Sequence, residues 1–404
     1  MKWDKIKFSN LYSIESKNGL TKPSRVRGSG YKMINMGELF SYDRIYDIPM
    51  ELVPLTEREK CSSKVESGDL LFARQSLVLE GAGKCSIVMD VSPLTVFESH
   101  LIRVRLDSKR ANPLFYYYYF KSTQSPIKSI VSQCAQSGIR GSDLGELSVD
   151  FPVLEIQNRI ANILSNYDDL IENNQKQIKL LEEAAQRLYK EWFVDLRFPG
   201  YENTPITDGV PQGWNVRKLE TFGEIITGKT PSTAKESYYN GDIPFVKIPD
   251  MHNMIYPIIT ESTLSEDGAN TQKNKFIPKD SLMVSCIATV GLVNISIQNC
   301  QTNQQINSIV LNNVRDLYYL YFSTKGLKML LDGVGSNGAT MTNVNKSKFA
   351  NIEILYPSID LCEQFYDFCK PIFEKILVLS KSTIELKNIR DQLLPKLMSG
   401  ELEV

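Results

Sequence analysis

The sequence has few of the residues that build metal sites and hydrolase triads. It contains two histidines, His100 and His252, and its seven cysteines are scattered without a Cys-x-x-Cys pair. A zinc site with the usual ligand spacing is therefore not expected, and a Ser-His-Asp hydrolase would have to use one of these two histidines. An odd number of scattered cysteines is typical of reduced thiols, so we expect a cytoplasmic protein.

Long hydrophobic runs and an excess of one charge are also missing. No apolar run approaches the ~20 residues that cross a bilayer, and the N-terminal residues lack the apolar segment of a signal peptide, so a membrane protein is not expected.

The 46 basic and 47 acidic residues give a formal net charge of −1, which exerts no global attraction on nucleic acid. Any DNA site must be local. Residues 1–40 hold eight basic and three acidic residues, and the first long helical segment carries acidic residues such as Asp168 and Glu172.

The chain does contain an internal repeat of about 200 residues, which indicates a duplicated domain pair rather than a solenoid. Its 404 residues, 42% of them hydrophobic, are enough for several globular domains. Trp3 and Trp214 open two similar segments. Near the ends of the segments, apolar residues recur at a constant offset, so that Ile139 corresponds to Val344 and Leu144 to Phe349.

Each copy is expected to combine an α+β globular domain with a long helix. The first part of each copy alternates short apolar runs with Gly, Pro, Asn and Ser, which is typical of short strands and loops. We predict globular domains at 1–151 and 214–356, helices at 152–196 and 357–404, and a linker at 197–213.

Apolar residues in both helical segments recur at steps of four and three, which is the pattern of a heptad seam. About 33 residues form a helix of roughly 50 Å. The simplest way to cover its apolar stripe is to pair the two helices as a left-handed coiled coil; the alternative is that each helix packs only on its own domain. Asn174 in the seam is a candidate for setting the register, or else marks a solvated seam end. The expected seam residues are Ile160, Leu164, Ile171, Ile178, Leu181, Leu188, Ile372, Ile376, Leu379, Leu386 and Leu393.

Two catalytic motifs match in sequence but lack the surrounding elements that their chemistry needs, and a third matches only in part. Residues 223–230 fit the P-loop pattern, but no buried strand precedes them and Pro231 follows at once, so an ATP site is not expected. Residues 333–338 fit Gly-x-Gly-x-x-Gly but follow a helical stretch instead of a strand. Residues 112–115 partly match the Asn-Pro-Pro-Phe motif of adenine methyltransferases, yet Asn112 with Pro113 explains them as a helix start.

The tyrosine-rich runs 116–120 and 318–322 are expected in the core instead of stacking on bases. A stand-alone P-loop ATPase, a DNA methyltransferase and a coiled-coil adaptor that does not bind DNA stay as alternatives.

Polar and basic loops are the remaining candidates for function. Arg can bind guanine through two hydrogen bonds, and Asn or Gln can bind adenine in the same way, while Lys suits phosphate. The two copies differ most in these loops. The candidate DNA-contacting residues are Lys22, Arg25, Arg27, Arg74, Gln75, Lys121, Gln136, Arg140, Lys229, Thr230, Gln304, Gln305, Asn343, Asn345 and Lys346.

The order of several motifs resembles the specificity subunit of type I restriction–modification systems over essentially the whole chain. The motifs are residues 226–232 (Ile-Thr-Gly-Lys-Thr-Pro-Ser), 243–247, 302–306 (Thr-Asn-Gln-Gln-Ile) and 341–345, with the helix endings 188–195 and 393–402. The sequence departs from the family pattern at Asp360 and Cys362, and its first domain lacks a Gly-Lys-Thr loop.

The resemblance implies two α+β target-recognition domains, each reading one half of a split site on double-stranded DNA. It also implies that the two helices form an antiparallel coiled coil, with a pseudo-twofold internal repeat, that sets the half-site spacing. Such a subunit has no catalysis and binds no cofactor of its own. It docks two methyltransferase subunits that bring S-adenosylmethionine, and motor-nuclease subunits that use ATP and magnesium join for restriction.

Overall fold

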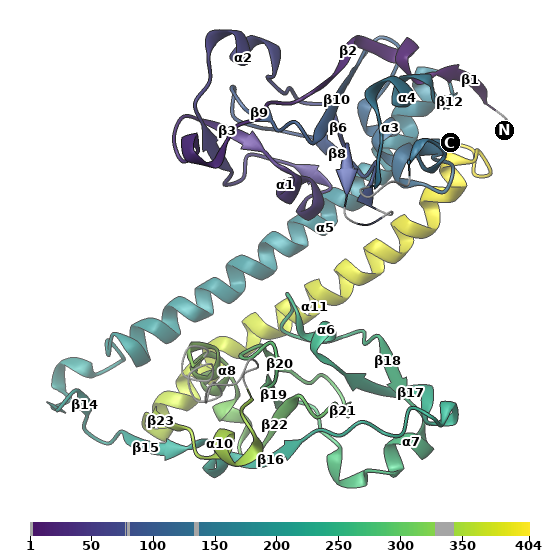
Figure 1. Cartoon of the computed structure of the whole chain (residues 1–404). Helices are drawn as coiled ribbons and strands as arrows, with labels where there is room; N and C mark the ends of the chain where they lie inside the picture. Colours follow the sequence, from purple (N-terminus) through teal and green to yellow (C-terminus); the bar gives the residue numbers. More distant parts are fainter. Residues whose placement is uncertain (1–2, 77, 79–80, 133–136, 328–342) are drawn as a thin grey trace. The chain divides into compact units, whose positions relative to one another are not determined.

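The computed structural model describes residues 3–76, 78, 81–132, 137–327 and 343–404 (Figure 1). It contains two compact units, one made of Met1–Glu172 with Ile384–Val404 and the other of Asn173–Thr383. We call them unit 1 and unit 2. Both unit boundaries fall inside long helices, α5 (Leu154–Tyr189) and α11 (Ile359–Met398). Each unit therefore joins a globular part to a segment of each long helix.

The globular part of unit 1 is built on a five-stranded sheet with a smaller sheet beside it. The larger sheet has the order β2 (Tyr12–Asn18), β10 (Leu101–Leu106), β6 (Leu70–Ala73), β8 (Cys85–Val88) and β4 (Arg44–Ile45). The smaller has the order β5 (Glu51–Val53), β3 (Tyr31–Ile34) and β9 (Val96–Phe97). Two further strand pairs are β1 (Asp4–Lys7) with β12 (Ser148–Phe151) and β7 (Gln75–Ser76) with β11 (Ser137–Gly138). The short helices are α1 (Met36–Ser41), α2 (Glu57–Ser62), α3 (Pro113–Lys121) and α4 (Gly141–Glu146).

The globular part of unit 2 repeats this plan. Its larger sheet has the order β16 (Gly223–Thr227), β22 (Ile306–Leu311), β19 (Leu282–Ser285) and β20 (Val293–Ile295). Its smaller sheet has the order β18 (Ser262–Leu264), β17 (Tyr239–Val246) and β21 (Gln301–Thr302). The remaining pairs are β15 (Asn215–Lys218) with β23 (Glu353–Tyr356) and β13 (Ile206–Thr207) with β14 (Val210–Pro211). The short helices are α6 (Ile248–Met251), α7 (Glu266–Asn270), α8 (Leu317–Gly326) and α10 (Lys346–Ala350).

Equivalent backbone hydrogen bonds confirm that the two globular parts are copies. The amide of Ile139 donates to the carbonyl of Arg74, and the amide of Val344 donates to the carbonyl of Cys286. In each smaller sheet one strand pair is parallel, β3 with β9 and β17 with β21. The offset between Ile139 and Val344 is the one that the sequence predicts.

The two tyrosine-rich runs form the buried helices α3 and α8, as predicted. Residues 116–120 and 318–322 are all at most 7% exposed. The hydroxyl of Tyr116 donates to the carbonyl of Asp150 in β12, and the hydroxyl of Tyr319 donates to the carbonyl of Leu355 in β23. A buried tyrosine needs such a partner for its hydroxyl, so these rings serve the core.

Within each unit the segments of α5 and α11 pack antiparallel, which confirms the predicted pairing. In unit 1, Ile160 and Leu164 share a hydrophobic cluster with Leu397, and Asp168 forms an ion pair with Arg390. In unit 2, the Nδ2 amide of Asn174 donates to Ser382 Oγ, and Trp192 contacts Phe365. Residue numbers rise along α5 as they fall along α11. The predicted seam residues are all buried or half-buried, and α11 continues through both Pro371 and Pro395.

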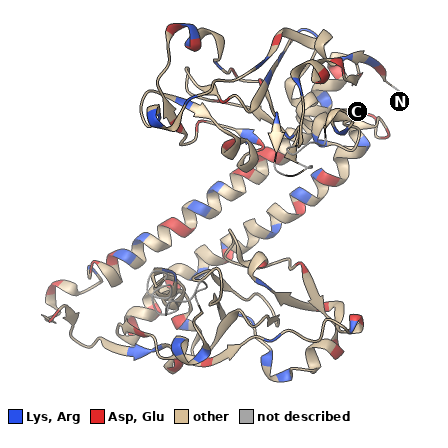
Figure 2. Ribbon diagram, viewed as in Figure 1, with Lys and Arg blue, Asp and Glu red and all other residues tan. Residues whose placement is uncertain are grey.

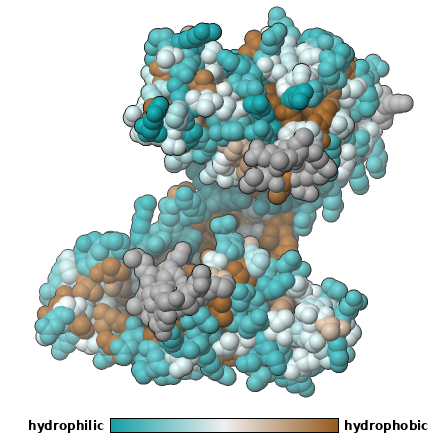
Figure 3. All heavy atoms as spheres, in the orientation of Figure 1, coloured by the Kyte–Doolittle hydropathy of each residue, from teal (hydrophilic) through white to brown (hydrophobic). Residues whose placement is uncertain are grey.

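The face of the molecule drawn in Figure 3 is mainly hydrophilic, with separate hydrophobic patches. Among the described helices, none combines the length and the apolar character that a bilayer crossing requires. The six cysteines in the described part of the chain are free thiols, and of these only Cys61 is exposed.

Candidate nucleic-acid interface

In unit 2, several loops meet at one end of the larger sheet. The amide of Gly228 donates to the carbonyl of Ile306, and the amide of Lys229 donates to the carbonyl of Thr302. From the other side, the amide of Cys286 donates to the carbonyl of Gln305. These bonds place the loop after β16 beside the loop before β22. The segment that starts at residue 343 joins them, because Asn343 forms a bridge with Ile287.

This sheet end brings together seven of the predicted residues, namely Lys229, Thr230, Gln304, Gln305, Asn343, Asn345 and Lys346. Lys229 and Gln304 are exposed, and the hydroxyl of Thr230 donates to Gln304 Oε1 at 2.7 Å. Asn345 has a structural task as well, because its Oδ1 accepts from the amide of Lys348 and caps α10. The result is a surface of amide and ammonium groups on a hydrogen-bonded backbone.

The same end of the larger sheet in unit 1 gathers Arg74, Gln75 and Arg140. The amide of Arg74 donates to the carbonyl of His100 at 2.8 Å, and the carbonyl of Arg74 accepts from Ile139, next to Arg140. Sequence reasoning did not single out His100 as a site residue. It lies one residue before β10, and its ring Nδ1 is 3.0 Å from Gln75 Oε1. The repeat offset that links Ile139 to Val344 also links His100 to Gln305, and that signal was present in the sequence.

The basic residues near the N-terminus lie elsewhere and are mostly paired. Lys22 pairs with Glu59 and Arg27 with Glu51, while Arg25 is exposed on the turn between them. Lys5, Lys7 and Lys32 also have carboxylate partners beyond residue 40. The local excess of positive charge that the sequence indicates is therefore largely neutralised by the fold. Figure 2 shows this mixing of basic and acidic residues. The acidic residues of the long helices are accompanied by basic ones, since α5 has six acidic and four basic residues and α11 has six of each.

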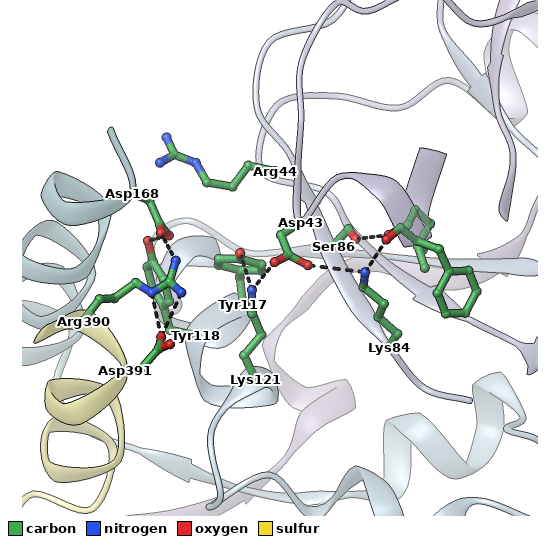
Figure 4. A network of polar contacts seen from close by, with 12 residues as sticks. Asp43, Arg44, Lys84, Ser86, Tyr117, Tyr118, Lys121, Asp168, Arg390 and Asp391 are labelled. Atoms are coloured by element: carbon green, nitrogen blue, oxygen red, sulfur yellow. Dashed lines mark hydrogen bonds and ion pairs between the residues drawn. The ribbon is translucent and has the colours of Figure 1, made fainter. Parts of the chain in front are cut away.

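Lys121 lies at the end of α3, where a carboxylate holds it (Figure 4). Its Nζ is 2.6 Å from Asp43 Oδ2 and also donates to the hydroxyl of Tyr117. Lys84 approaches the other oxygen of Asp43 at 3.4 Å. Burial raises the pKa of the Asp43 carboxyl, but the two lysines outweigh burial and leave this pKa below its usual value. A phosphate contact by Lys121 stays a prediction and would have to compete with Asp43.

A second polar cluster in Figure 4 fastens the globular part of unit 1 to both long helices. The hydroxyl of Tyr118 donates to Asp168 Oδ2 at 2.6 Å, and Arg390 of α11 pairs with the other oxygen of Asp168. Burial and the adjacent Asp168 raise the pKa of Tyr118, so this tyrosine stays protonated. Arg44 of β4 pairs with Asp169 and Glu172 of α5. These contacts hold the sheet against the helices.

Unit 2 achieves the same attachment with different residues. Glu182 of α5 accepts a hydrogen bond from the hydroxyl of Tyr321 at 2.7 Å and pairs with Lys325 at 2.6 Å. Both partners belong to α8, the counterpart of α3. In each unit, an acidic residue of α5 therefore binds the tyrosine-rich helix.

The P-loop alternative is not supported by the geometry. Residues 223–227 form β16 itself, and the first described helical turn after Thr230 is a 3-10 turn at Glu236–Tyr238. The loop is therefore not followed directly by the α-helix whose N-terminus binds phosphate in a P-loop. Gln136, residues 333–338, and Met341 and Thr342 of the 341–345 motif lie outside the described residues.

Comparisons with known proteins agree with this duplicated architecture. A family model described as the type I restriction modification DNA specificity domain matches residues 2–183 and 211–388. The chain is 31% identical over 403 residues to the type I restriction enzyme HindI specificity subunit of Haemophilus influenzae, covering 84% of this chain and 87% of that protein. It is 28% identical to the MjaIX specificity subunit of Methanocaldococcus jannaschii over 100% of this chain and 94% of that protein. Its fold is similar to the crystal structure of a type I restriction–modification S subunit from M. genitalium, with a TM-score of 0.63, 16% identity and coverage of 98% and 96%.

Proposed function

The chain belongs to the family of type I restriction modification DNA specificity domains, and from this membership we propose that it selects the DNA sequence in a type I restriction–modification complex. The observation that carries the proposal is the repeated sheet end. Two copies of one fold differ in their side chains at equivalent backbone positions. Arg140 stands against Asn345, and the half-buried Arg74 stands against the buried Cys286. Two such readers would recognise two different half-sites.

In this proposal, residues 1–151 and 214–356 are the two target-recognition domains. Arg74 and Arg140 suit guanine, whose O6 and N7 both accept, and Gln75, Gln304 and Asn343 suit adenine. The exposed Lys229 and Lys346 suit phosphate oxygens. Phosphate contacts add affinity without sequence preference, so the two kinds of residue should behave differently on mutation.

The long helices are proposed to set the half-site spacing and to dock partner subunits. Several of their apolar side chains are exposed, among them Leu170 and Leu180 of α5 and Val378 and Ile389 of α11, each between 43% and 59%. Such residues suit a protein partner. We propose two methyltransferase subunits as these partners, with motor-nuclease subunits joining for restriction. Methyl transfer from S-adenosylmethionine and ATP-driven steps would then reside in the partners, in the cytoplasm.

The test is to co-express the chain with its methyltransferase subunits and to map methylated adenines by single-molecule sequencing. A two-part motif with a constant spacer is expected. Arg74→Ala should relax one half of that motif and leave the other intact. Lys346→Ala should weaken binding to every site by a similar factor and reduce the salt dependence of binding, because it removes a phosphate contact.

The matched control is Lys179→Ala, since Lys179 is an exposed lysine on α5 that pairs only loosely with Glu183. This variant should keep both the motif and the salt dependence. A motif without two parts, a change in both halves on mutating Arg74, or binding that ignores DNA sequence and salt would each contradict the proposal.

A further inference from the structure

His100 occupies a rigid and exposed position at the sheet end of unit 1. The backbone on either side is tied down, since the amide of Ser99 donates to Leu20 and the amide of Leu101 donates to Glu98. The carbonyl of His100 itself accepts from the amide of Arg74. Its side chain is exposed beside Arg74 and Gln75. A group that reads DNA needs this combination of a fixed backbone and an accessible side chain.

The contact with Gln75 determines which hydrogen-bonding group His100 presents. Nδ1 of His100 lies 3.0 Å from Gln75 Oε1, a carbonyl oxygen that can only accept, so this hydrogen bond assigns the proton of the neutral ring to Nδ1. The Nε2 atom of the neutral ring is then an acceptor. Gln75 is itself held in β7, which pairs with Gly138 of β11.

The equivalent position in unit 2 presents the opposite kind of group. The backbone carbonyl of Gln305 accepts from the amide of Cys286, as the carbonyl of His100 accepts from the amide of Arg74. Its side-chain Oε1 accepts from Nδ2 of Asn303 at 2.9 Å. With the oxygen engaged, the group that Gln305 presents is its NH2 donor.

We propose that His100 and Gln305 are equivalent base-reading residues of opposite hydrogen-bonding sense, an inference that rests on the proposed function. In the major groove, adenine N6 and cytosine N4 donate, whereas guanine and thymine present acceptors at these sites. His100 therefore selects adenine or cytosine on the strand it contacts. Gln305 selects a base that presents an acceptor at the site of that amino group, which is guanine through O6 or thymine through O4.

Two substitutions at each position separate the hydrogen-bonding sense from the presence of a side chain. His100→Asn keeps a donor near the position of Nδ1, and so the contact with Gln75, but has no atom at the position of Nε2. His100→Gln reaches that position with an amide that can donate or accept. In unit 2, Gln305→Glu keeps an oxygen for Asn303 and replaces the NH2 donor with a second acceptor oxygen. Gln305→Ala removes the reading group.

The experiment measures methylation rates of the full complex on duplexes in which each base pair of both half-sites is varied. The wild-type complex first defines the two-part motif. His100→Asn is expected to lose about tenfold to a hundredfold of discrimination at one adenine or cytosine of one half-site. Gln305→Glu is expected to shift preference at one position of the other half-site from guanine or thymine toward adenine or cytosine.

The outcomes are distinct. If the wild-type complex has no two-part motif, the proposed function fails and this inference fails with it. If the motif exists but neither His100→Asn nor Gln305→Glu alters base preference, only this inference is overturned. It is also overturned if the base affected by His100→Asn is guanine or thymine. Thermal unfolding confirms that each variant is folded, and because the two positions lie in different units, a variant that misfolds leaves the other position as a complete test.

Discussion

At the scale of single residues, two glycines show how tightly the sheet ends are built. A Cβ atom on Gly228 would lie 2.2 Å from the carbonyl oxygen of Asn303, and one on Gly19 would lie 2.1 Å from that of Phe97. A backbone carbonyl cannot swing aside, so Gly228→Ala is expected to destabilise unit 2 by about 1–3 kcal/mol. The control is Gly37→Ala in α1, where a Cβ meets nothing within 4 Å and helix propensity favours alanine. Denaturant titrations monitored by hydrogen exchange measure the stability of the Gly228→Ala and Gly37→Ala variants. Equal unfolding midpoints for the two variants would contradict the prediction.

Asp168 is the residue on which the attachment of unit 1 to its helices depends most. It is 5% exposed, accepts from Tyr118 and pairs with Arg390. Asp168→Asn removes the buried carboxylate that pairs with Arg390 and leaves it only the exposed Asp391, and we expect a loss of roughly 3 kcal/mol in the free energy of unfolding. The double variant Asp168→Leu with Arg390→Met should lose less unfolding free energy than the sum of the losses caused by its two substitutions made singly. Arg159→Ala, which breaks an exposed pair with Glu155, should cost under about 1 kcal/mol. Additive losses in urea titrations would show that the pair is not coupled.

At the scale of elements, the helix pair contains one polar seam contact whose role can be measured. Asn174 is 8% exposed, and its Nδ2 donates to Ser382 Oγ at 3.3 Å. Ser382→Ala leaves this amide without its partner and is expected to cost about 1 kcal/mol. Asn174→Leu should instead raise the unfolding midpoint while weakening the preference for one register, because a buried asparagine selects register at a cost in stability. Unfolding curves and light scattering on both variants test this. If the Asn174→Leu variant is more stable and still forms a single species, the register is set by the other seam residues and not by Asn174.

At the scale of the whole molecule, the proposed function predicts how helix length relates to the DNA site. Both α5 and α11 continue through the boundary between the units. Removing one heptad from each shortens the helical path by about 10 Å, which equals about three base pairs of duplex. The methylated motif of that variant is therefore expected to keep both half-sites and to have a spacer shorter by about three base pairs. Methylome sequencing measures the spacer directly, with the Lys179→Ala chain of unchanged length as control. An unchanged spacer would show that the helices do not set it.

The sequence alone determined the features that depend on local pattern. Heptad steps placed Ile160 and Leu393 in the helix seam, and the constant offset matched Ile139 to Val344, because periodic apolar residues and duplicated segments are visible without long-range contacts. Only the tertiary structure decided which polar residues are available. Lys22 is paired with Glu59 and Lys121 with Asp43, residues 37 and 78 positions away in the chain, and no local pattern connects them. His100 joins the candidate site for the same reason, since strand pairing brings it to Arg74 and Gln75.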